Sequence, residues 1–369
     1  MKKLRLAIIG QGRSGRDIHG AFLLTPANDK FEVVAVCDAL EHRREKAKRE
    51  FNCTVVEDYR ELIGMKDQID LVVNASYSHM HYPITKELLQ NGISVLCEKP
   101  FGATYDECVE LMDLAKKNGV HVFAFHQSLL APYVLNVKEI AESGKIGDIV
   151  SLTIRYPGFN HRYDWQTLQC RLAGSLYNTG PHPLGQAIDL LGWDDTTLAF
   201  SRLSNQNSVG DADDCDKVIL VNSKGVYADI EITSCDALST FEYKLCGTKG
   251  TIKATPSSYT VKYLPDGYEL PKLQVESLMN EKGDPDYCRE NFVLTEESGT
   301  TAAIIANPAY SNETGNVAFD QSVKSFYDMM YDTVVNGKEA LVSAEMGAKV
   351  VDIIEKCHKA NPIEQKFFL

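Results

Sequence analysis

The stretch that decides the fold is Met1-Lys-Lys-Leu-Arg-Leu-Ala-Ile-Ile-Gly-Gln-Gly-Arg-Ser-Gly-Arg16. It contains a short apolar run, Leu4–Ile9, followed by three glycines spaced G-x-G-x-x-G, which are Gly10, Gly12 and Gly15. In a dinucleotide site the first glycine permits a tight strand-to-helix turn and the second lets the backbone approach a pyrophosphate. The third lets the helix pack close to the strand, and the N–H groups at the start of that helix face the phosphates.

Bulk composition narrows the class of protein. The 369 residues are too many for one ordinary core, so two domains are expected. The 44% hydrophobic and 24% charged composition is typical of a soluble globular protein. A net charge of −13 disfavours a nucleic-acid partner, whose phosphates need a basic surface. No stretch approaches the roughly 20 apolar residues of a membrane span.

The thiol pattern and the N-terminus favour the cytoplasm. Lys2 and Lys3 precede an apolar run, as in a signal peptide, but this run ends after Ile9 and is too short. The ten cysteines include no C-x-x-C pair, so reduced thiols are expected.

Residues 1–126 alternate strand-like and helix-like segments. The strand candidates are Leu4–Ile9, Phe31–Cys37, Leu71–Asn74, Ser94–Cys97 and Val120–Phe125. The helix candidates are Ser14–Leu24, Glu41–Phe51, His81–Gln90 and Tyr105–Lys117. The strands are apolar without strict alternation, as in parallel strands buried on both faces. This pattern predicts an α/β fold with a doubly wound, Rossmann-type parallel sheet.

The expected second strand ends at Asp38, where a carboxylate can accept hydrogen bonds from the adenosine ribose. A 2′-phosphate would meet that carboxylate, so NAD is favoured over NADP. His42, Arg43 and Arg44 follow and could bind such a phosphate. The solvated face of a helix is the favoured interpretation of these three residues.

Residues 127–369 follow another pattern. A helix is expected over Leu129–Ser143, a strand over Asp148–Tyr156, and closing helices over Phe319–Asn336 and Ser343–Lys359. Runs of period two are Thr197–Leu203, Asp216–Val221, Val226–Ile232 and Glu242–Cys246. They predict a second α/β domain with a large open, mostly antiparallel sheet. Residues 255–315, rich in Pro, Gly, Ser and Asn, are expected to form a loop-rich insertion.

Two motifs are candidates for proton transfer. Cys97-Glu98-Lys99-Pro100 ends the fifth predicted strand, where ligands bind in open α/β sheets. Burial of Lys99 there would lower its pKa and suit it to exchange protons with a hydroxyl. His182 lies between two prolines, and imidazole titrates near neutrality. A surface lysine and a structural histidine are the open alternatives.

Two further segments carry weaker signals. Ala75-Ser-Tyr-Ser-His-Met-His81 follows the expected fourth strand, and His79 and His81 suggest a metal. With no third ligand at a recognisable spacing, no metal site is expected. The acidic run Asp211-Ala-Asp-Asp-Cys-Asp216 lacks the Gly and Glu of a calcium loop and is interpreted as a solvated turn.

Together these segments resemble the glucose-fructose oxidoreductase/inositol dehydrogenase family, Gfo/Idh/MocA. The matching segments are Gly10-x-Gly12-x-x-Gly15, Cys37-Asp38, Gly92-x-x-Val-Leu-Cys-Glu-Lys-Pro100, Ser143-Gly-Lys-Ile-Gly147, Asp164-Trp165 and Gly174–Gly192. The resemblance implies a Rossmann domain and a sheet that forms the oligomer interface and one wall of a sugar site. It also implies that Lys99 contacts the reacting hydroxyl and that His182 is the acid/base histidine.

The sequence departs from the family pattern at several of these positions. Asn178 and Gly185 stand where the family usually has aspartates before and after the histidine. Neutral Asn178 cannot stabilise an imidazolium as a carboxylate would. Tyr77 replaces a usual proline, and Gln127 and Ser128 replace usual arginines.

The function expected is NAD-dependent hydride transfer to or from a carbon of a sugar, cyclitol or related polyol. Lys99 and His182 are the expected catalytic residues, and Asn178, Tyr77 and Trp165 are expected to bind the substrate. The residues expected to bind the cofactor are Gly10, Gly12, Arg13, Ser14, Gly15, Asp38, Ala75, Ser76, His81, Glu98 and Lys99. A homodimer or homotetramer through the C-terminal sheet is expected, without a nucleic-acid or membrane partner. A glycoside hydrolase or lyase that retains NAD and a non-catalytic nucleotide-dependent sensor remain alternatives.

Overall fold

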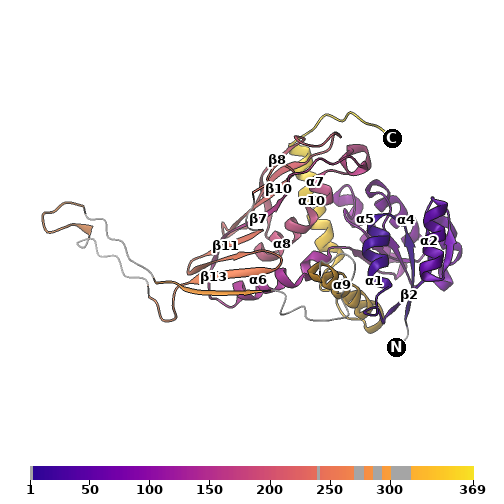
Figure 1. The fold of residues 1–369 in the computed structure, drawn as a ribbon, viewed down its shortest axis with the longest axis horizontal. Coiled ribbons are helices and arrows are strands. Elements are labelled where there is room, and N and C mark those ends of the chain that lie inside the picture. The colour runs from indigo at the N-terminus through magenta and orange to yellow at the C-terminus, as the bar shows by residue number, and fades with distance from the viewer. Residues whose placement is uncertain (1–2, 239–241, 270–277, 286–292, 301–316) are drawn as a thin grey trace.

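The computed structural model describes residues 3–238, 242–269, 278–285, 293–300 and 317–369. Figure 1 shows two sheets side by side, with the N-terminal sheet and its helices on one side and the larger sheet on the other. In the described residues no helix is both long and apolar enough to cross a bilayer.

The N-terminal sheet is parallel, six-stranded and ordered β3-β2-β1-β4-β5-β6. Its strands are β1 (Leu4–Ile9), β2 (Phe31–Cys37), β3 (Thr54–Val56), β4 (Leu71–Asn74), β5 (Ser94–Cys97) and β6 (Val122–Ala124). In register, Ile9 lies beside both Cys37 and Asn74. The chain therefore leaves β1, β2 and β4 at the same edge of the sheet, which is where ligands bind in such folds.

Helices cover both faces of this sheet. They are η1 (Gly15–Gly20), α1 (Ala21–Leu23), α2 (Glu41–Phe51), α3 (Arg60–Gly64), η2 (Lys66–Gln68), η3 (Ser78–Met80), α4 (His81–Gln90) and α5 (Tyr105–Asn118). Leu6 and Ile8 of β1 face one core, and Ala7 and Ile9 face the other. The expected doubly wound Rossmann sheet is confirmed.

The second sheet has eight strands in the order β14-β13-β12-β11-β7-β10-β9-β8. They are β7 (Ile149–Pro157), β8 (Thr197–Ser204), β9 (Cys215–Val221), β10 (Tyr227–Thr233), β11 (Tyr243–Gly247), β12 (Gly250–Ala254), β13 (Ser258–Tyr263) and β14 (Thr295–Thr300). Every pair is antiparallel except β7 with β10, so the expected mostly antiparallel sheet is confirmed.

Helices pack on the face of this sheet that looks toward the Rossmann sheet (Figure 1). The elements after β6 are η4 (Gln127–Leu130), α6 (Pro132–Glu142), η5 (Trp165–Thr167), η6 (Gln169–Arg171), α7 (Ser175–Asn178), α8 (Pro181–Leu191), α9 (Val317–Asn336) and α10 (Ala344–Ala360). Leu152 and Ile154 of β7 and Ile230 of β10 bury their side chains against Leu184 and Ile188 of α8. These contacts hold α7 and α8 between the two sheets.

Helix α9 follows the expected domain boundary at residue 126 in the sequence but packs against the N-terminal domain. Phe326, Tyr327 and Met330 of α9 are buried in the same core as Leu6 and Ile8 of β1. Helix α9 therefore completes one face of the Rossmann sheet, although it lies some 300 residues later in the chain.

One expectation about local structure needs correction, and two features of the N-terminal domain were not predicted. In the expected loop-rich insertion 255–315, β13 and β14 are paired strands, with Ser258 beside Thr300; the rest of it lies partly outside the described residues. The expected helix Ser14–Leu24 is a π-helical turn, η1, continued by α1. The short strand β3 was not predicted.

Candidate active site

The glycine turn between β1 and η1 has two crowded positions and one open one. A Cβ on Gly10, where φ is +87°, would lie 2.4 Å from the carbonyl oxygen of Ala75. A Cβ on Gly15 would lie 1.8 Å from the carbonyl oxygen of Gly10. At Gly12 the nearest atom would be Arg43 Nη1, 3.9 Å away. Packing within the protein therefore explains Gly10 and Gly15, whereas the space beside Gly12 is open.

Asp38 follows β2 beside this turn, and its carboxylate is almost buried. Oδ2 accepts a hydrogen bond from Gln11 N at 2.7 Å, and Oδ1 accepts one from Leu40 N at 2.9 Å. A carboxylate has about four acceptor positions, so two remain for ribose hydroxyls.

The two arginines after Asp38 are not simply solvated, which corrects the favoured interpretation. Arg44 Nη1 donates to the carbonyl oxygen of Asp38 at 2.7 Å. Arg43 Nη1 lies 3.5 Å from Asp38 Oδ2, between this carboxylate and the open position at Gly12. Arg43 therefore borders the predicted ribose site.

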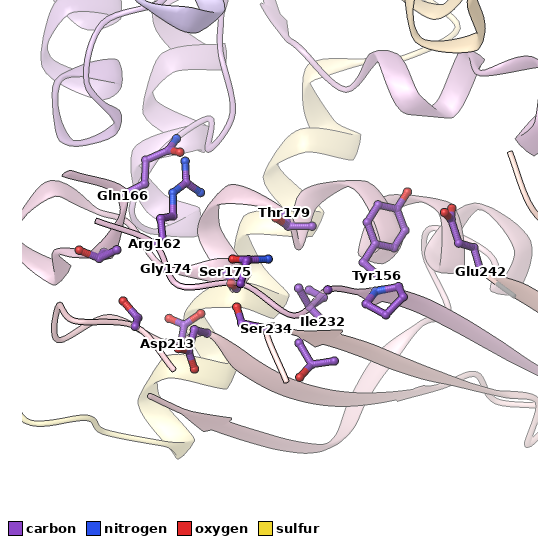
Figure 2. A pocket seen from close by; sticks show the side chains of 17 residues that line it. Tyr156, Arg162, Gln166, Gly174, Ser175, Thr179, Asp213, Ile232, Ser234 and Glu242 are labelled. Carbon is purple, nitrogen blue, oxygen red and sulfur yellow. The ribbon is translucent and has the colours of Figure 1, made fainter. Parts of the chain in front are cut away.

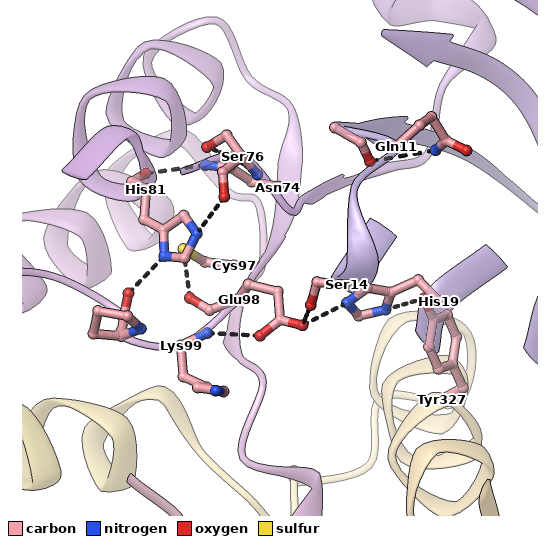
Figure 3. A network of polar contacts seen from close by, with 12 residues as sticks. Gln11, Ser14, His19, Asn74, Ser76, His81, Cys97, Glu98, Lys99 and Tyr327 are labelled. Carbon is pink, nitrogen blue, oxygen red and sulfur yellow. Dashed lines mark hydrogen bonds and ion pairs between the residues drawn. The ribbon is translucent and has the colours of Figure 1, made fainter. Parts of the chain in front are cut away.

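A buried network supports the loop that carries Lys99 (Figure 3). Glu98 accepts hydrogen bonds from Ser14 Oγ and from Lys99 N, and its Oε1 lies 3.2 Å from His19 Nε2. His19 Nδ1 in turn lies 2.8 Å from the hydroxyl of Tyr327 on α9. Burial opposes ionisation of Glu98, but His19, Lys99 and Ser14 outweigh it and lower its pKa to about 2. The carboxylate thus joins β5, η1 and α9.

His81 forms a second support for the same loop. Its buried ring lies between two backbone carbonyl oxygens, that of Pro100 at 2.8 Å from Nδ1 and that of Ser76 at 3.2 Å from Nε2. Burial lowers the pKa of this histidine. The side chains of His81 and Glu98 thus form hydrogen bonds within the protein. We therefore expect them to position the loops that would bind the cofactor, rather than to contact the cofactor themselves.

Lys99 reaches across to the C-terminal part of the chain. Its Nζ donates to the backbone oxygen of Asn178 and, at 3.3 Å, to Asn178 Oδ1. Burial lowers the pKa of Lys99, Glu98 opposes this, and Arg13 and Arg162 lower it further. Gln166 Nε2 donates to Asn178 Oδ1 at 2.9 Å. Gln166 was not predicted from the sequence, because only the fold brings η5 beside α7.

His182, in the first turn of α8, lies close to Lys99. Its Nδ1 is 3.0 Å from Ser128 Oγ on η4, and no other hydrogen bond to its ring occurs in the described part of the chain. Burial, Lys99 and the neighbouring His126 lower the pKa of His182 to about 3. Burial and Lys99 lower the pKa of His126 to about 4. The predicted low charge of His182 thus agrees with the structure, but burial, not Asn178, is the main cause.

The two aromatic residues predicted to bind substrate contact each other across the two parts of the chain. The rings of Tyr77 and Trp165 meet edge to face with centroids 5.0 Å apart. Arg171 lies 4.9 Å above the Tyr77 ring and 3.1 Å from His79 Nε2. Tyr77 remains 48% exposed, so its ring is accessible at the edge of the site. No group of three metal-ligating side chains occurs among the described residues.

A cavity of about 260 Å³ lies between the segment that follows β7, α7 and the large sheet (Figure 2). Gln166 and Thr179 line it near Asn178, and Tyr156 and Glu242 line it farther along the sheet. Asp213 also lines it, and its Oδ2 accepts a hydrogen bond from Leu176 N of α7 at 2.7 Å.

The acidic run that ends at Asp216 is buried, which corrects its interpretation as a solvated turn. Asp211 and Asp214 accept hydrogen bonds from backbone N–H groups of neighbouring loops. Burial and the nearby Asp213 raise the pKa of Asp216 well above its usual value. These residues order the loops around α7.

Comparison with known proteins identifies the family. The model of an oxidoreductase family with an NAD-binding Rossmann fold, GFO_IDH_MocA, matches residues 4–126, and that of the GFO/IDH/MocA C-terminal domain matches residues 134–253. The chain therefore belongs to the GFO/IDH/MocA family of NAD-binding oxidoreductases.

Individual relatives are distant. An uncharacterized oxidoreductase of Schizosaccharomyces pombe is 30% identical over 60% of both chains. The scyllo-inositol 2-dehydrogenase (NADP(+)) of Bacillus subtilis is 27% identical over 56% of both. The chain thus spans less than two thirds of these relatives. The crystal structure of GenD2 from gentamicin A biosynthesis, in complex with NAD, has a TM-score of 0.74 at 18% identity and covers 98% of this chain and 94% of its own.

Proposed function

We propose that the protein is an NAD-dependent dehydrogenase of a sugar, cyclitol or related polyol, with Lys99 and His182 as its catalytic residues. The observation that carries the proposal is the contact of Lys99 with Asn178 beside a histidine that burial keeps neutral. A buried ammonium and a neutral imidazole are suited to manage the proton of one hydroxyl group. The inositol dehydrogenase among the relatives supports this substrate class.

The residues at the strand edge would hold the cofactor. The pyrophosphate would lie at Gly12, with Arg13 and Ser14 beside it, and the ribose hydroxyls at Asp38. NADP is less favoured because its 2′-phosphate would approach the Asp38 carboxylate. When bound, the nicotinamide supplies hydride transfer, and the protein supplies orientation and proton management.

Each side chain at the site would have its own role toward the substrate hydroxyl. Lys99 Nζ would hold the reacting oxygen, and the second ring nitrogen of His182 would accept its proton. Asn178 would orient both Lys99 and the substrate, and Tyr77 and Trp165 would cover the entrance. We further propose that residues 1–126 bind NAD and residues 127–369 bind substrate and form the oligomer, in the cytoplasm.

The test uses Lys99→Ala and His182→Ala. We expect each variant to lower kcat by about 10²–10⁴-fold, the range for loss of a positioned acid or base. NAD binding, measured by titration calorimetry, should stay within a few-fold of the wild type. Wild-type turnover in both variants would contradict the assignment.

The same assay separates the alternatives. Net formation of NADH with a free sugar or polyol supports a dehydrogenase. Release of sugar from a glycoside without net NADH would indicate a hydrolase or lyase that retains its cofactor. Binding of NAD and sugar without any turnover would indicate a sensor.

A further inference from the structure

The cavity beside the reaction centre contains an arginine whose outer nitrogen atoms are not engaged. Arg162 Nε donates to both carboxylate oxygens of Asp164, at 3.0 and 2.9 Å. In the described part of the chain no hydrogen bond occupies its two Nη groups. The side chain is 30% exposed and lines the cavity, and Figure 2 shows it beside Gln166. Asp164 thus fixes the guanidinium group through Nε. The two Nη groups, called the Nη fork below, remain for a ligand.

Two further cations act on the same region, although the whole chain carries −13. The charges of Arg13 and Arg162 each lower the pKa of Lys99, so the three cations repel one another. Like charges held together in a partly desolvated site are destabilising, and a bound anion would relieve the repulsion. Asp164, which is half-exposed, offsets only part of this charge.

The acidic residues that line the cavity have partners of their own. The carboxylates of Asp213 and Asp214 accept hydrogen bonds from backbone N–H groups of Leu176, Gln206 and Asn207, which stabilise a carboxylate without removing its charge. Burial raises the pKa of Glu242 to about 7, so much of this group is uncharged near neutrality. In that form Glu242 would donate to or accept from hydroxyl groups rather than repel an anion.

We propose that the substrate is a sugar acid, whose carboxylate binds the Nη fork of Arg162 while its hydroxyls occupy the cavity between Gln166 and Glu242. The inference rests on the proposed dehydrogenase function and specifies its substrate. A planar carboxylate matches the fork in a bidentate pair. A phosphate ester dianion carries close to two negative charges and a single arginine balances only one, so a carboxylate is favoured over a phosphate ester.

The experiment compares matched substrates on the NAD-loaded enzyme. The pairs are D-glucuronate with D-glucose and D-galacturonate with D-galactose, and D-glucose 6-phosphate is the phosphate arm. We expect kcat/KM to be about 10- to 100-fold higher for the better acid than for its neutral partner, the range for a hydrogen-bonded charge pair. Higher salt should reduce this ratio. A higher kcat/KM for the phosphate than for either uronate would overturn the choice of carboxylate.

Two variants test the role of Arg162. Arg162→Gln should raise KM for the acid about 10-fold or more and remove the preference, whereas Arg162→Lys should retain part of it. Arg60→Gln is the control, because the Arg60 side chain is 59% exposed on α3 and pairs with Asp58 and Glu87, outside the site. It should keep the wild-type ratio of acid to neutral substrate.

The outcomes separate this inference from the proposed function. Equal or better turnover of the neutral sugars, or equal loss on both substrates in Arg162→Gln, would overturn the sugar acid and leave the dehydrogenase intact. If neither class is turned over, the dehydrogenase fails. Titration calorimetry of D-glucuronate into the NAD-loaded wild type and Arg162→Gln then decides the inference, because equal binding or no binding would refute it.

Discussion

The charge state of the candidate site depends on a few single residues. Lys99 donates to two neutral oxygen atoms of Asn178, where a carboxylate would have held it as a strong ion pair. The nearby Glu98 receives its hydrogen bond from the backbone N of Lys99, not from Nζ. A lysine with neutral partners and a lowered pKa gives up its proton more readily. Asn178 would therefore favour a Lys99 that exchanges protons over one that only carries charge.

Two histidines, His126 in the interior and the half-buried His182, make the stability of the protein sensitive to acid. In the unfolded chain His126 and His182 take up protons near pH 6.5, whereas in the folded protein their pKa values are about 4 and about 3. Between these limits the unfolded state binds more protons, so stability falls as the pH decreases. We expect the thermal unfolding midpoint to drop from pH 7 to pH 4.

A variant separates the contribution of one histidine. His126→Gln should reduce this drop, by on the order of 3 kcal/mol of unfolding free energy at most. His42→Gln is the control, because the side chain of His42 is exposed on α2. An unchanged pH dependence in His126→Gln, measured by calorimetry at several pH values, would contradict the argument.

At the scale of elements, the turn between β1 and η1 separates packing from ligand binding. We expect Gly12→Ala to fold with wild-type stability, since its Cβ would meet only Arg43 Nη1 at 3.9 Å. The methyl group would nevertheless occupy the space proposed for the pyrophosphate. NAD binding should therefore weaken about 10-fold or more in calorimetric titration.

Gly15→Ala is the matched comparison. Its Cβ would overlap the carbonyl oxygen of Gly10, so β1 and η1 would have to separate. We expect a loss of several kcal/mol of unfolding free energy, as for other overpacked sites. If Gly12→Ala binds NAD as strongly as the wild type, the cofactor does not bind at this turn.

Some strands could be predicted from the sequence alone, and others could not. The bounds of β1, β2, β4 and β5 match the predicted strands residue for residue, because continuous apolar runs flanked by turn residues mark buried parallel strands. β14, Thr295–Thr300, has no apolar residue, so nothing in its sequence distinguished an edge strand from a loop.

The candidate site was predictable only where a motif marks it. Lys99 and His182 stand in local patterns, and the structure brings Lys99 to Asn178 and His182 to Ser128. Gln166 and His126 carry no local signal, since contacts between distant elements define their roles. The buried acidic run ending at Asp216 was misjudged because its partners are backbone N–H groups from distant loops.

At the scale of the whole molecule, α9 ties the two parts of the chain together. Tyr327 reaches the network of His19 and Glu98, whose backbone neighbour is Lys99 (Figure 3). Helix α9 thus supports the loop that carries the proposed catalytic lysine. The two parts are therefore expected to unfold together, because one core of the Rossmann sheet is incomplete without α9.

One face of the large sheet is not covered by helices in the described part of the chain. Figure 1 shows α6, α8 and α10 on the side toward the Rossmann sheet, and no helix drawn from the described residues covers the other side. On that outer face Phe200, Ile219 and Asp229 lie in register on β8, β9 and β10, and Phe200 is 54% exposed. Asp229 is paired with Lys217, so part of the charge of this face is neutralised within it. Exposed apolar groups beside internally paired charges suit an interface between copies.

We therefore expect a dimer or tetramer that forms through this outer face. Phe200→Glu would place an unpaired carboxylate in the interface and should shift the mass measured by light scattering toward the monomer. Leu341→Glu is the control, because Leu341 is 71% exposed in the segment between α9 and α10 and lies outside the sheet. If Phe200→Glu keeps the mass of a wild-type oligomer, the interface lies elsewhere. If the wild type is itself a monomer at micromolar concentration, the outer face has another role.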